Sequence, residues 1–361
     1  MHRLLTLFTG LLLPFSTFAN YDVERVAQGL SIPWAIEFVT EHQLIINEKD
    51  GKISLLDLNN GQTQRLYTIK DIFNSGQGGL LDVTSYKDST GNTTLFFSYS
   101  KPTPEGATLA VAKADFIKDQ IQNFTELFVA DSTSDTSRHF GSRIEIVDGH
   151  LFVSIGDRGE RDNGQDVTTH AATIVRLNLQ GNAPIDNPFS NHSEALPEIW
   201  SYGHRNPQGL FYDEPSQTLW SIEHGPRGGD EINRIEKGAN YGWARVSHGR
   251  EYWGPLDVGE AKSLPGMVDP ELVYIPSIAP SNIVLYRGDK YPELDGKLLA
   301  GALKLAHINV VEIKDNQLHK HARILGSLNE RIRDITISPT NEIFFSTDNG
   351  NIYRLISKQP E

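Results

Sequence analysis

The sequence has no cysteine, so disulfide bonds cannot hold its fold together. Stability must come from the burial of apolar surface instead. The 361 residues allow this, because a domain of about 300 residues buries roughly three quarters of the surface that its unfolded chain exposes. No linker or low-complexity segment interrupts the chain, and we expect residues 20–361 to form a single domain.

An excess of positive charge is also lacking. The formal net charge is −13 at pH 7, which argues against nucleic acid or an anionic membrane surface as a partner. A local cluster of Arg and Lys in such a chain is therefore informative, because the overall composition does not supply one.

Long apolar runs are missing except at the N-terminus. Residues 1–19 combine a basic start, an apolar stretch and a small-residue ending, which is typical of a secretory signal peptide cleaved after Ala19. The apolar stretch is too short to span a bilayer, and no later stretch is long enough. We therefore expect an exported protein, periplasmic or secreted, without membrane insertion.

Long amphipathic helix patterns are scarce as well, and short β-rich segments take their place. Six of these segments resemble one another, each with an apolar start and a small or polar end: residues 44–48, 95–99, 151–155, 219–223, 298–302 and 343–347. Repeats built from several short strands are typical of propeller blades. The sequence thus predicts an all-β fold, a six-bladed β-propeller with its active site in the funnel on one face.

Two further segments fit this ring. Residues 21–27 could pair into the last blade, closing the ring and removing an exposed sheet edge. The widest gap between repeats contains residues 238–266, which have little strand pattern and are interpreted as an inserted loop. A pair of β-sandwiches is the alternative architecture, which a chain of this length favours less.

Loops at the ends of blade strands would meet in the funnel, so polar residues there are candidates for a site. His139 lies beside a glycine turn and could act as a general base near neutral pH. Asp157 follows the third repeat and is the kind of group that orients an imidazole. Gln77, in another glycine turn, could face a ligand, although a bare turn explains it equally well.

Cationic side chains recur at equivalent blade ends. Arg205 and Asn206 lie in a donor-rich stretch, Lys304 follows the fifth repeat, and Arg331 and Arg333 precede the sixth. Residues i and i+2 of an extended chain share a face, so the last two guanidinium groups should repel one another unless an anion lies between them. A solvated β face is the plainer explanation of that pair, but the full set predicts a multiply anionic small ligand.

A glycine-rich turn at residues 225–229 follows the fourth repeat and precedes Asp230 and Glu231. Glycine lets backbone carbonyls approach an ion closely, and carbonyl and carboxylate oxygens are the ligands that Ca²⁺ selects. This turn therefore predicts a metal beside the anionic ligand, with a long polar turn as the alternative.

Together these motifs resemble the soluble quinoprotein glucose dehydrogenase family, and within it the periplasmic aldose sugar dehydrogenases. The resemblance runs from about Gln28 to the C-terminus and is most specific in residues 202–208 and 223–231. That family is a six-bladed propeller that binds pyrroloquinoline quinone (PQQ) and Ca²⁺ at the funnel.

The resemblance implies a role for each candidate residue. His139 would be the catalytic base and Asp157 its partner. The implied cofactor-binding residues are Gln77, Arg205, Asn206, Tyr252, Gly254, Lys304, Arg331 and Arg333, and a weaker match suggests that Trp253 stacks on the cofactor.

Two calcium sites are implied in the same way. The carbonyls of Gly225 and Pro226 would bind the Ca²⁺ that touches PQQ. A second Ca²⁺ would be held by the Glu231 side chain and the Tyr241 carbonyl.

Two stretches depart from the family pattern. Ala172 and Thr173 stand where the pattern has Gly and Lys, at positions that look structural. Residues 247–264 match weakly and shape the sugar side, which leaves the range of substrates open.

The implied reaction is the oxidation of an aldose sugar at C1. His139 would remove the proton of the anomeric hydroxyl while the C1 hydrogen passes as hydride to C5 of PQQ, with Ca²⁺ as Lewis acid, and an aldonolactone would result. The implied partners are aldose sugars and an unidentified electron acceptor, and the protein would be a monomer or a homodimer.

Two other functions stay open from sequence alone. A calcium-dependent lactone hydrolase of the six-bladed propeller type would need a central cluster of Asp, Asn and Glu but no cage of arginines. A non-catalytic propeller that binds glycans or peptides would not need His139 and Asp157 together. The cations at Lys304, Arg331 and Arg333 favour the quinoprotein.

Overall fold

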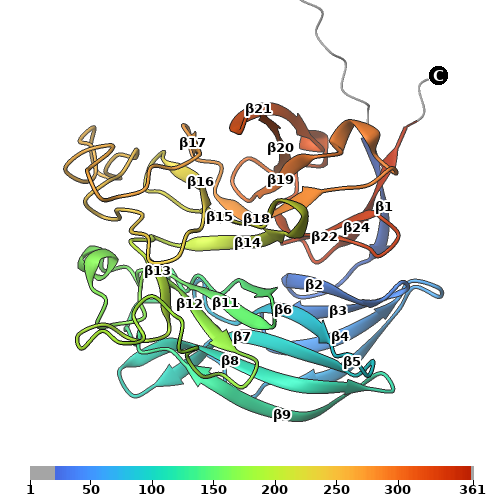
Figure 1. Cartoon of the computed structure of the whole chain (residues 1–361). Helices are drawn as coiled ribbons and strands as arrows, with labels where there is room; N and C mark the ends of the chain where they lie inside the picture. Colours follow the sequence, from blue (N-terminus) through green and yellow to red (C-terminus); the bar gives the residue numbers. More distant parts are fainter. Residues whose placement is uncertain (1–20, 359–361) are drawn as a thin grey trace, which may run out of the picture.

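The computed structural model describes residues 21–358, which form six four-stranded antiparallel sheets arranged as a propeller. The sequence colours run around the molecule in chain order, and the innermost strand of each sheet contacts those of its two neighbours (Figure 1). The predicted all-β, six-bladed fold is confirmed. The predicted signal peptide, residues 1–19, lies outside the described residues.

The strands follow one another from the centre of each blade outward. Blade 1 consists of β2 (Pro33–Thr40), β3 (Gln43–Glu48), β4 (Lys52–Asp57) and β5 (Gln62–Thr68). Blade 2 consists of β6 (Leu80–Lys87), β7 (Thr93–Thr103), β8 (Gly106–Ile117) and β9 (Gln120–Val129). Blade 3 consists of β10 (Ile144–Val147), β11 (His150–Ile155), β12 (Thr173–Asn178) and β13 (Ile199–Tyr202).

The second half of the chain repeats this plan. Blade 4 consists of β14 (Pro207–Asp213), β15 (Thr218–Glu223), β16 (Asp230–Arg234) and β17 (Leu272–Tyr274). Blade 5 consists of β18 (Pro280–Tyr286), β19 (Lys297–Ala302), β20 (His307–Lys314) and β21 (Gln317–Ile324). Blade 6 consists of β22 (Ile332–Ile337), β23 (Ile343–Thr347), β24 (Ile352–Ser357) and β1 (Tyr21–Ala27).

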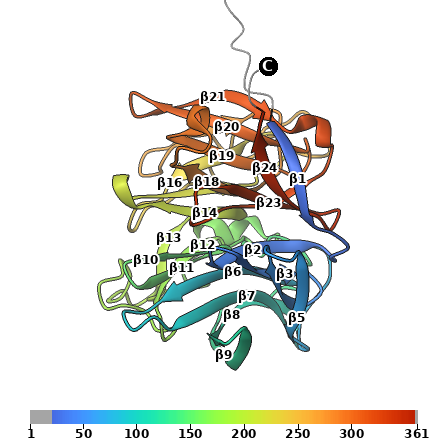
Figure 2. The same ribbon diagram turned by 90° about the vertical axis from the view of Figure 1, so that its right-hand side faces the viewer.

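The ring closes through the first described strand. β1 pairs antiparallel with β24 and becomes the outermost strand of blade 6, as the sequence predicts. The dark blue strand lies beside the red one in both views (Figures 1 and 2). Closure ties the two ends of the described chain into one sheet and leaves β24 with a partner on each side.

The six repeats found in the sequence are the second strands β3, β7, β11, β15, β19 and β23. Their residues are largely buried on both faces, because neighbouring blades cover each sheet from either side. The outermost strand β5 is polar and mostly exposed instead. Position within the blade therefore determines whether a strand is uniformly apolar.

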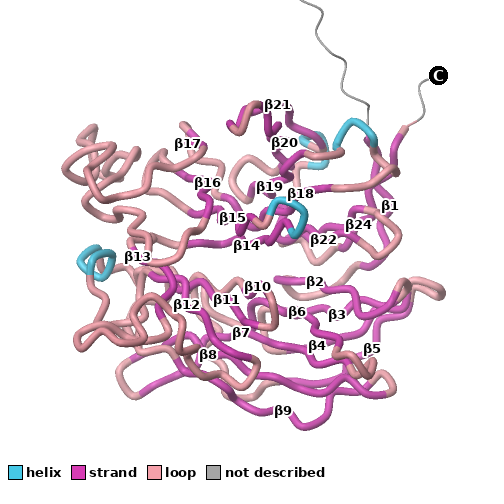
Figure 3. The backbone as a smooth tube through the Cα atoms, viewed as in Figure 1, coloured by secondary structure: helices cyan, strands magenta, loops and turns pink. Residues whose placement is uncertain are grey.

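Helical structure is limited to four short 3-10 turns in the connections, η1 (Arg161–Gln165), η2 (Glu214–Ser216), η3 (Pro292–Leu294) and η4 (Gly326–Leu328). Over residues 21–358, none of the helices has the length and apolar character needed to cross a membrane. The predicted insertion is also present, since residues 235–271 connect β16 to β17 without a strand and form the large pink loop region of Figure 3.

One irregularity recurs where a site would be built. In β2, β6, β14, β18 and β22, the pairing register shifts within the first residues of the strand. Such bulges bend a strand and re-aim its side chains. Four predicted site residues lie in the loops that precede three of these strands: Gln77 before β6, Arg205 and Asn206 before β14, and Arg331 before β22.

Candidate active site

A histidine and a carboxylate from the same blade form the centre of the site. The Nδ1 atom of His139 lies 2.6 Å from Oδ1 of Asp157. The same Oδ1 accepts from the backbone N–H of Gly159 at 2.7 Å. With Asp157 as acceptor, Nδ1 carries the ring proton and the Nε2 lone pair of a neutral imidazole stays available.

The backbone holds His139 in an uncommon conformation. Its φ is +55°, in the left-handed region. Its N–H donates to Oε1 of Gln77 at 2.7 Å, which joins the predicted blade 2 residue to the dyad. A Cβ atom at Gly156 would collide with the carbonyl of His139, so only glycine permits this approach of the two loops.

Burial and charge both act on the imidazole. His139 is 8% exposed, and this burial lowers its pKa below the ordinary value, although the hydrogen bond and charge of Asp157 oppose the shift and Arg205 and Arg138 add to it. A neutral histidine at pH 7 follows, which is the protonation state that a general base requires.

Arg205 and Asn206 adjoin the dyad from blade 4. The Oδ1 atom of Asn206 accepts from the N–H of Gly141, while its Nδ2 is buried without a partner. The Nη1 atom of Arg205 donates to the carbonyls of His224 and Gly225 at 3.1 and 2.9 Å, and its Nε is also a buried donor without a partner. Buried polar groups are nearly always bonded, so the two free donors fit a polar ligand.

The two arginines of blade 6, which were expected to need a bound anion between them, have a carboxylate partner within the protein. Asp348 pairs with Arg331 at 2.7 Å and with Arg333 through two bonds of 2.7 and 2.9 Å. Burial raises the pKa of Asp348, but the two guanidinium groups more than offset this and leave its pKa below the ordinary value. An internal carboxylate therefore supplies the anion that the Arg331–Arg333 pair needs, and that pair alone does not require a bound ligand.

Asp348 was missed by the sequence reasoning because nothing in residues 331–333 indicates which later loop folds over them. Lys49 of blade 1 was also missed. The charges of Arg333 and Asp348 act on its ammonium group, and burial, the largest cause, lowers its pKa. Each blade thus contributes a polar or cationic residue to the same face.

Lys304 and Tyr252 meet at a cavity of about 540 Å³ beside the Gly225 turn. His224, Gly225 and Pro226 line the same cavity. Gly254 does not line this cavity, but its carbonyl accepts a hydrogen bond from Arg227, which is one of the lining residues. Tyr252 and Trp253 are 67% and 74% exposed on the inserted loop, and Trp253 is not among the residues lining the cavity.

The predicted second metal site, Glu231 and the Tyr241 carbonyl, lies beside a second carboxylate, the buried Glu223. Glu223 and Glu231 are registered opposite one another on β15 and β16. Burial and then the charge of Glu223 raise the pKa of Glu231 well above its ordinary value. A cavity of about 10 Å³, large enough for about one water or ion, is lined by Glu223, Glu231 and Tyr241 together with Gly225 and Pro226.

The hydroxyl of Tyr241 is already used, since it donates to the carbonyl of Arg234 and accepts from the N–H of Glu236 at 2.9 Å. Its carbonyl is the group that could reach an ion. Among residues 21–358, no group of three or more His, Asp or Glu side chains is arranged to hold a metal, so a cation at either position would need backbone carbonyls among its ligands.

The two positions that depart from the family pattern are structural. Ala172 has φ +61°, a conformation that favours glycine, and it is buried between the Gly156 and His204 backbones. Thr173 is buried and its hydroxyl donates to the carbonyl of His170 at 2.6 Å. Neither side chain contacts the dyad.

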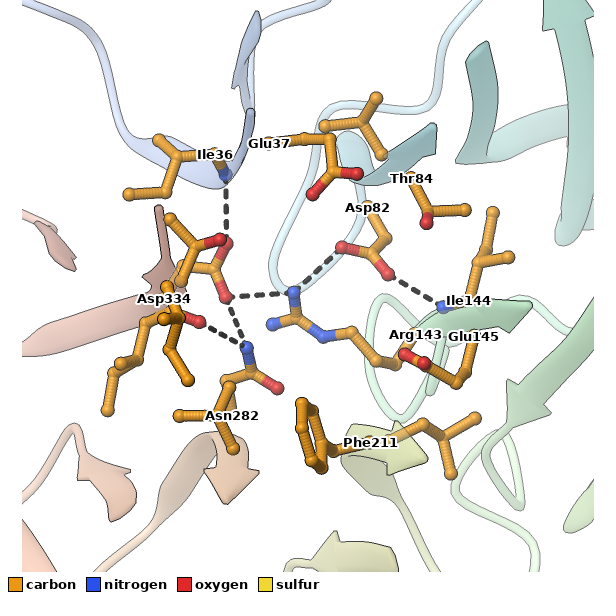
Figure 4. A pocket seen from close by; sticks show the side chains of 16 residues that line it. Ile36, Glu37, Asp82, Thr84, Arg143, Ile144, Glu145, Phe211, Asn282 and Asp334 are labelled. Carbon is orange, nitrogen blue, oxygen red and sulfur yellow. Dashed lines mark hydrogen bonds and ion pairs between the residues drawn. The ribbon is translucent and has the colours of Figure 1, made fainter. Parts of the chain in front are cut away.

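A second polar cluster lies deeper on the ring axis. Arg143 is 4% exposed and its Nη1 pairs with Asp82 at 2.7 Å and with Asp334 at 3.0 Å (Figure 4). Its other nitrogens donate to the carbonyls of Gln208 and Ser281, each at 3.1 Å. Asn282 also donates to Asp334, at 2.6 Å, as Figure 4 shows. We call Arg143, Asp82, Asp334 and Asn282 the central network.

Glu37 and Glu145 line the cavity of about 230 Å³ that continues the axis beyond this network (Figure 4). Burial raises the pKa of Glu37 to about 7 and that of Glu145 to about 8. A guanidinium group thus occupies the centre of the ring, where a metal-dependent hydrolase of the rival type would need its metal-ligand cluster.

Comparison with known proteins identifies the family of the chain. Residues 30–354 match the family model described as Glucose / Sorbosone dehydrogenase. Aldose sugar dehydrogenase YliI of Escherichia coli is 36% identical, with 92% of this chain and 91% of the relative covered. Quinoprotein glucose dehydrogenase B of Acinetobacter calcoaceticus is 26% identical, with 93% and 87% covered.

A solved structure gives the same result. The soluble aldose sugar dehydrogenase of Escherichia coli in its apo form superposes with a TM-score of 0.89 at 32% identity, over 94% of this chain and all of the other. The family match covers most of the chain. The chain belongs to the glucose/sorbosone dehydrogenase family.

Proposed function

We propose that this protein is an exported, periplasmic or secreted enzyme that oxidises aldose sugars at C1 to aldonolactones with PQQ and Ca²⁺. The observation that carries the proposal is the His139–Asp157 pair with its available Nε2, next to the unpartnered donors of Arg205 and Asn206. The relatives named as aldose sugar and quinoprotein glucose dehydrogenases support the same activity.

In this mechanism His139 acts as the general base. Its neutral imidazole takes the proton of the anomeric hydroxyl at Nε2, and Asp157, bonded at Nδ1, stabilises the imidazolium that forms. Gln77 fixes the loop of His139 from blade 2 through the backbone N–H. Base catalysis of this kind contributes about 10² to 10⁴ in rate.

Residues of blades 4, 5 and 6 would hold the quinone. The two free donors of Arg205 and Asn206 face one side, and Lys304, Arg331 and Arg333 supply positive charge for its carboxylates. Tyr252 and Gly254 would cover it from the inserted loop. When bound, PQQ with Ca²⁺ as Lewis acid would accept the C1 hydrogen as hydride, and its electrons would leave to a separate acceptor.

The metal would depend on the Gly225 turn. The Gly225 carbonyl is bonded by Arg205 and the Pro226 carbonyl by the hydroxyl of Ser277 at 3.1 Å. When Ca²⁺ binds, the Arg205 guanidinium would therefore either move away from the Gly225 carbonyl or share that carbonyl with the ion. Glu231 and the Tyr241 carbonyl would bind a second, structural Ca²⁺, which would compensate the buried carboxylate pair.

Reconstitution tests this proposal directly. PQQ and Ca²⁺ are added to the metal-free protein, and the absorbance of bound quinone is measured together with glucose-dependent dye reduction. We expect quinone binding at micromolar PQQ and dye reduction only when both additions are present. Omission of Ca²⁺, or of sugar, gives the matched controls. Failure to bind quinone at micromolar PQQ would contradict the proposal.

A further inference from the structure

Trp243 of the inserted segment contacts both Asp157, the partner of the proposed base, and Arg205 on the ligand side of the site. We propose that it is a positioning residue of the reaction, which holds the Asp157 carboxylate so that His139 keeps its orientation. This inference rests on the proposed function for its effect on turnover, but its geometric part can be tested without turnover.

The carboxylate of Asp157 is held at both oxygens. Oδ1 is bonded by Nδ1 of His139 and by the N–H of Gly159, and Oδ2 accepts from the indole Nε1 of Trp243 at 2.8 Å. A carboxylate fixed at one oxygen could still rotate about its Cβ–Cγ bond. The indole N–H prevents this rotation and so fixes the direction of the imidazole.

Trp243 is itself firmly placed. It is 6% exposed, its N–H donates to the carbonyl of Gly203 at 2.9 Å, and its carbonyl accepts from Nε2 of Gln165 at 2.7 Å. A Cβ at Gly164 would collide with that carbonyl. Loops of blades 3 and 4 therefore meet at this residue.

The same indole also faces the ligand side. The guanidinium carbon of Arg205 lies 5.2 Å from the centre of its ring, within the range of a cation–π interaction. One side chain thus supports the base through its N–H and a proposed ligand-binding arginine through its ring. The sequence alone does not reveal this role. Asp157 lies far earlier in the chain, on another blade, and only the fold brings the two side chains together.

The electrostatic consequence has a definite sign. The positive end of the indole N–H dipole points at the His139–Asp157 pair and disfavours the imidazolium form. Loss of that donor should raise the pKa of His139. The acid limb of the kcat/KM profile, which reports the free enzyme's base, should move to higher pH.

The test compares Trp243→Phe with Trp200→Phe. Trp200 is the control, because it also has an arginine over its ring, Arg176 at 5.1 Å, but its Nε1 has no hydrogen-bond partner. For Trp243→Phe we expect kcat to fall about 10-fold, as for the loss of a hydrogen bond to a charged group. KM should stay within about twofold and the acid limb should rise by roughly 0.5 pH unit. Trp200→Phe should leave the limb unchanged.

Histidine NMR titration of both variants without added cofactor separates the two proposals. A raised His139 pKa in Trp243→Phe with no sugar oxidation in the wild type would sink the proposed function and keep the positioning role. Wild-type turnover with an unchanged His139 titration and an unchanged limb would reduce Trp243 to a packing residue.

Asp157→Asn provides a measurement that does not depend on the folding of Trp243→Phe. The chain has five tryptophans, and an indole N–H bonded to a carboxylate resonates downfield. We expect one indole signal to move upfield in Asp157→Asn while the other four stay in place. If all five signals stay in place, no Trp243–Asp157 bond exists and the inference is wrong.

Discussion

The funnel site and the central network are both clusters of charge at the innermost strands, but they differ in how completely their groups are paired. In the central network, Arg143 uses all three guanidinium nitrogens on two carboxylates and two carbonyls. In the funnel, Nε of Arg205 and Nδ2 of Asn206 have no partner although they are buried. A satisfied cluster stabilises the fold, whereas unsatisfied donors on the same scaffold indicate a place for a ligand.

Asp348 shows that the distinction applies within the funnel too. It pairs with both Arg331 and Arg333, so those two cations resemble the central network more than they resemble Arg205. Charge of one sign along the sequence therefore does not distinguish a ligand site from an internal salt bridge, and the count of unpaired donors is the better criterion.

The largest expected effect lies in the funnel. His139→Ala should lower kcat by about 10² to 10⁴, the contribution of a general base, while PQQ binding and thermal stability stay close to wild type. Steady-state dye reduction and quinone absorbance measure the two quantities. His42→Ala, an exposed histidine in the β2–β3 turn, is the control. Near-normal turnover of His139→Ala would remove this residue from the mechanism.

Breaking the central network should show the opposite pattern. Arg143→Leu leaves Asp82 and Asp334 buried without their cation, and we expect a loss of about 3–5 kcal/mol in the free energy of unfolding. Urea unfolding at pH 8 measures it, because both carboxylates then have the strongest tendency to ionise. Arg205→Leu is the comparison, and it should weaken quinone binding with a much smaller loss of stability. Equal losses of stability in the two variants would erase the distinction between the clusters.

The smallest expected effect is the pH dependence of stability that comes from Glu145, in the central cavity beside the central network. Burial raises the pKa of Glu145 from 4.5 to about 8, so the folded protein holds a proton that the unfolded chain has released. The free energy of unfolding should therefore fall as the pH rises from about 4.5 towards 8. Glu145→Gln should flatten this fall, by an amount on the order of 1 kcal/mol at pH 8, because the side chain is only partly buried.

Urea unfolding at pH 5 and pH 8 checks the Glu145 prediction, with the exposed Glu105→Gln as control. A wild-type stability that stays level between these pH values would show that Glu145 is ionised in the folded state. The central cavity would then carry a buried negative charge, and the comparison with the funnel would need to include it.

Much of the fold was accessible from local sequence. The second strand of each blade is buried on both faces and therefore reads as an apolar segment, which is why six repeats at residues such as 151–155 and 343–347 predict six blades. The closing strand β1 and the insertion between β16 and β17 were predicted for the same reason, a clear presence or absence of strand pattern. The outer strands were harder to see, because exposed residues carry little pattern.

The amino-acid sequence by itself determined which residue types stand at the blade ends, and so the predicted cofactor-binding and base residues. Only the tertiary structure decided which of them are paired. Asp348, Arg143 and Trp243 acquire their roles from partners on other loops or blades, such as Asp157 for Trp243 and Asp334 for Arg143. Hydrogen bonds and ion pairs depend on distances of about 3 Å, and the ring of six blades sets those distances between residues that lie far apart along the chain.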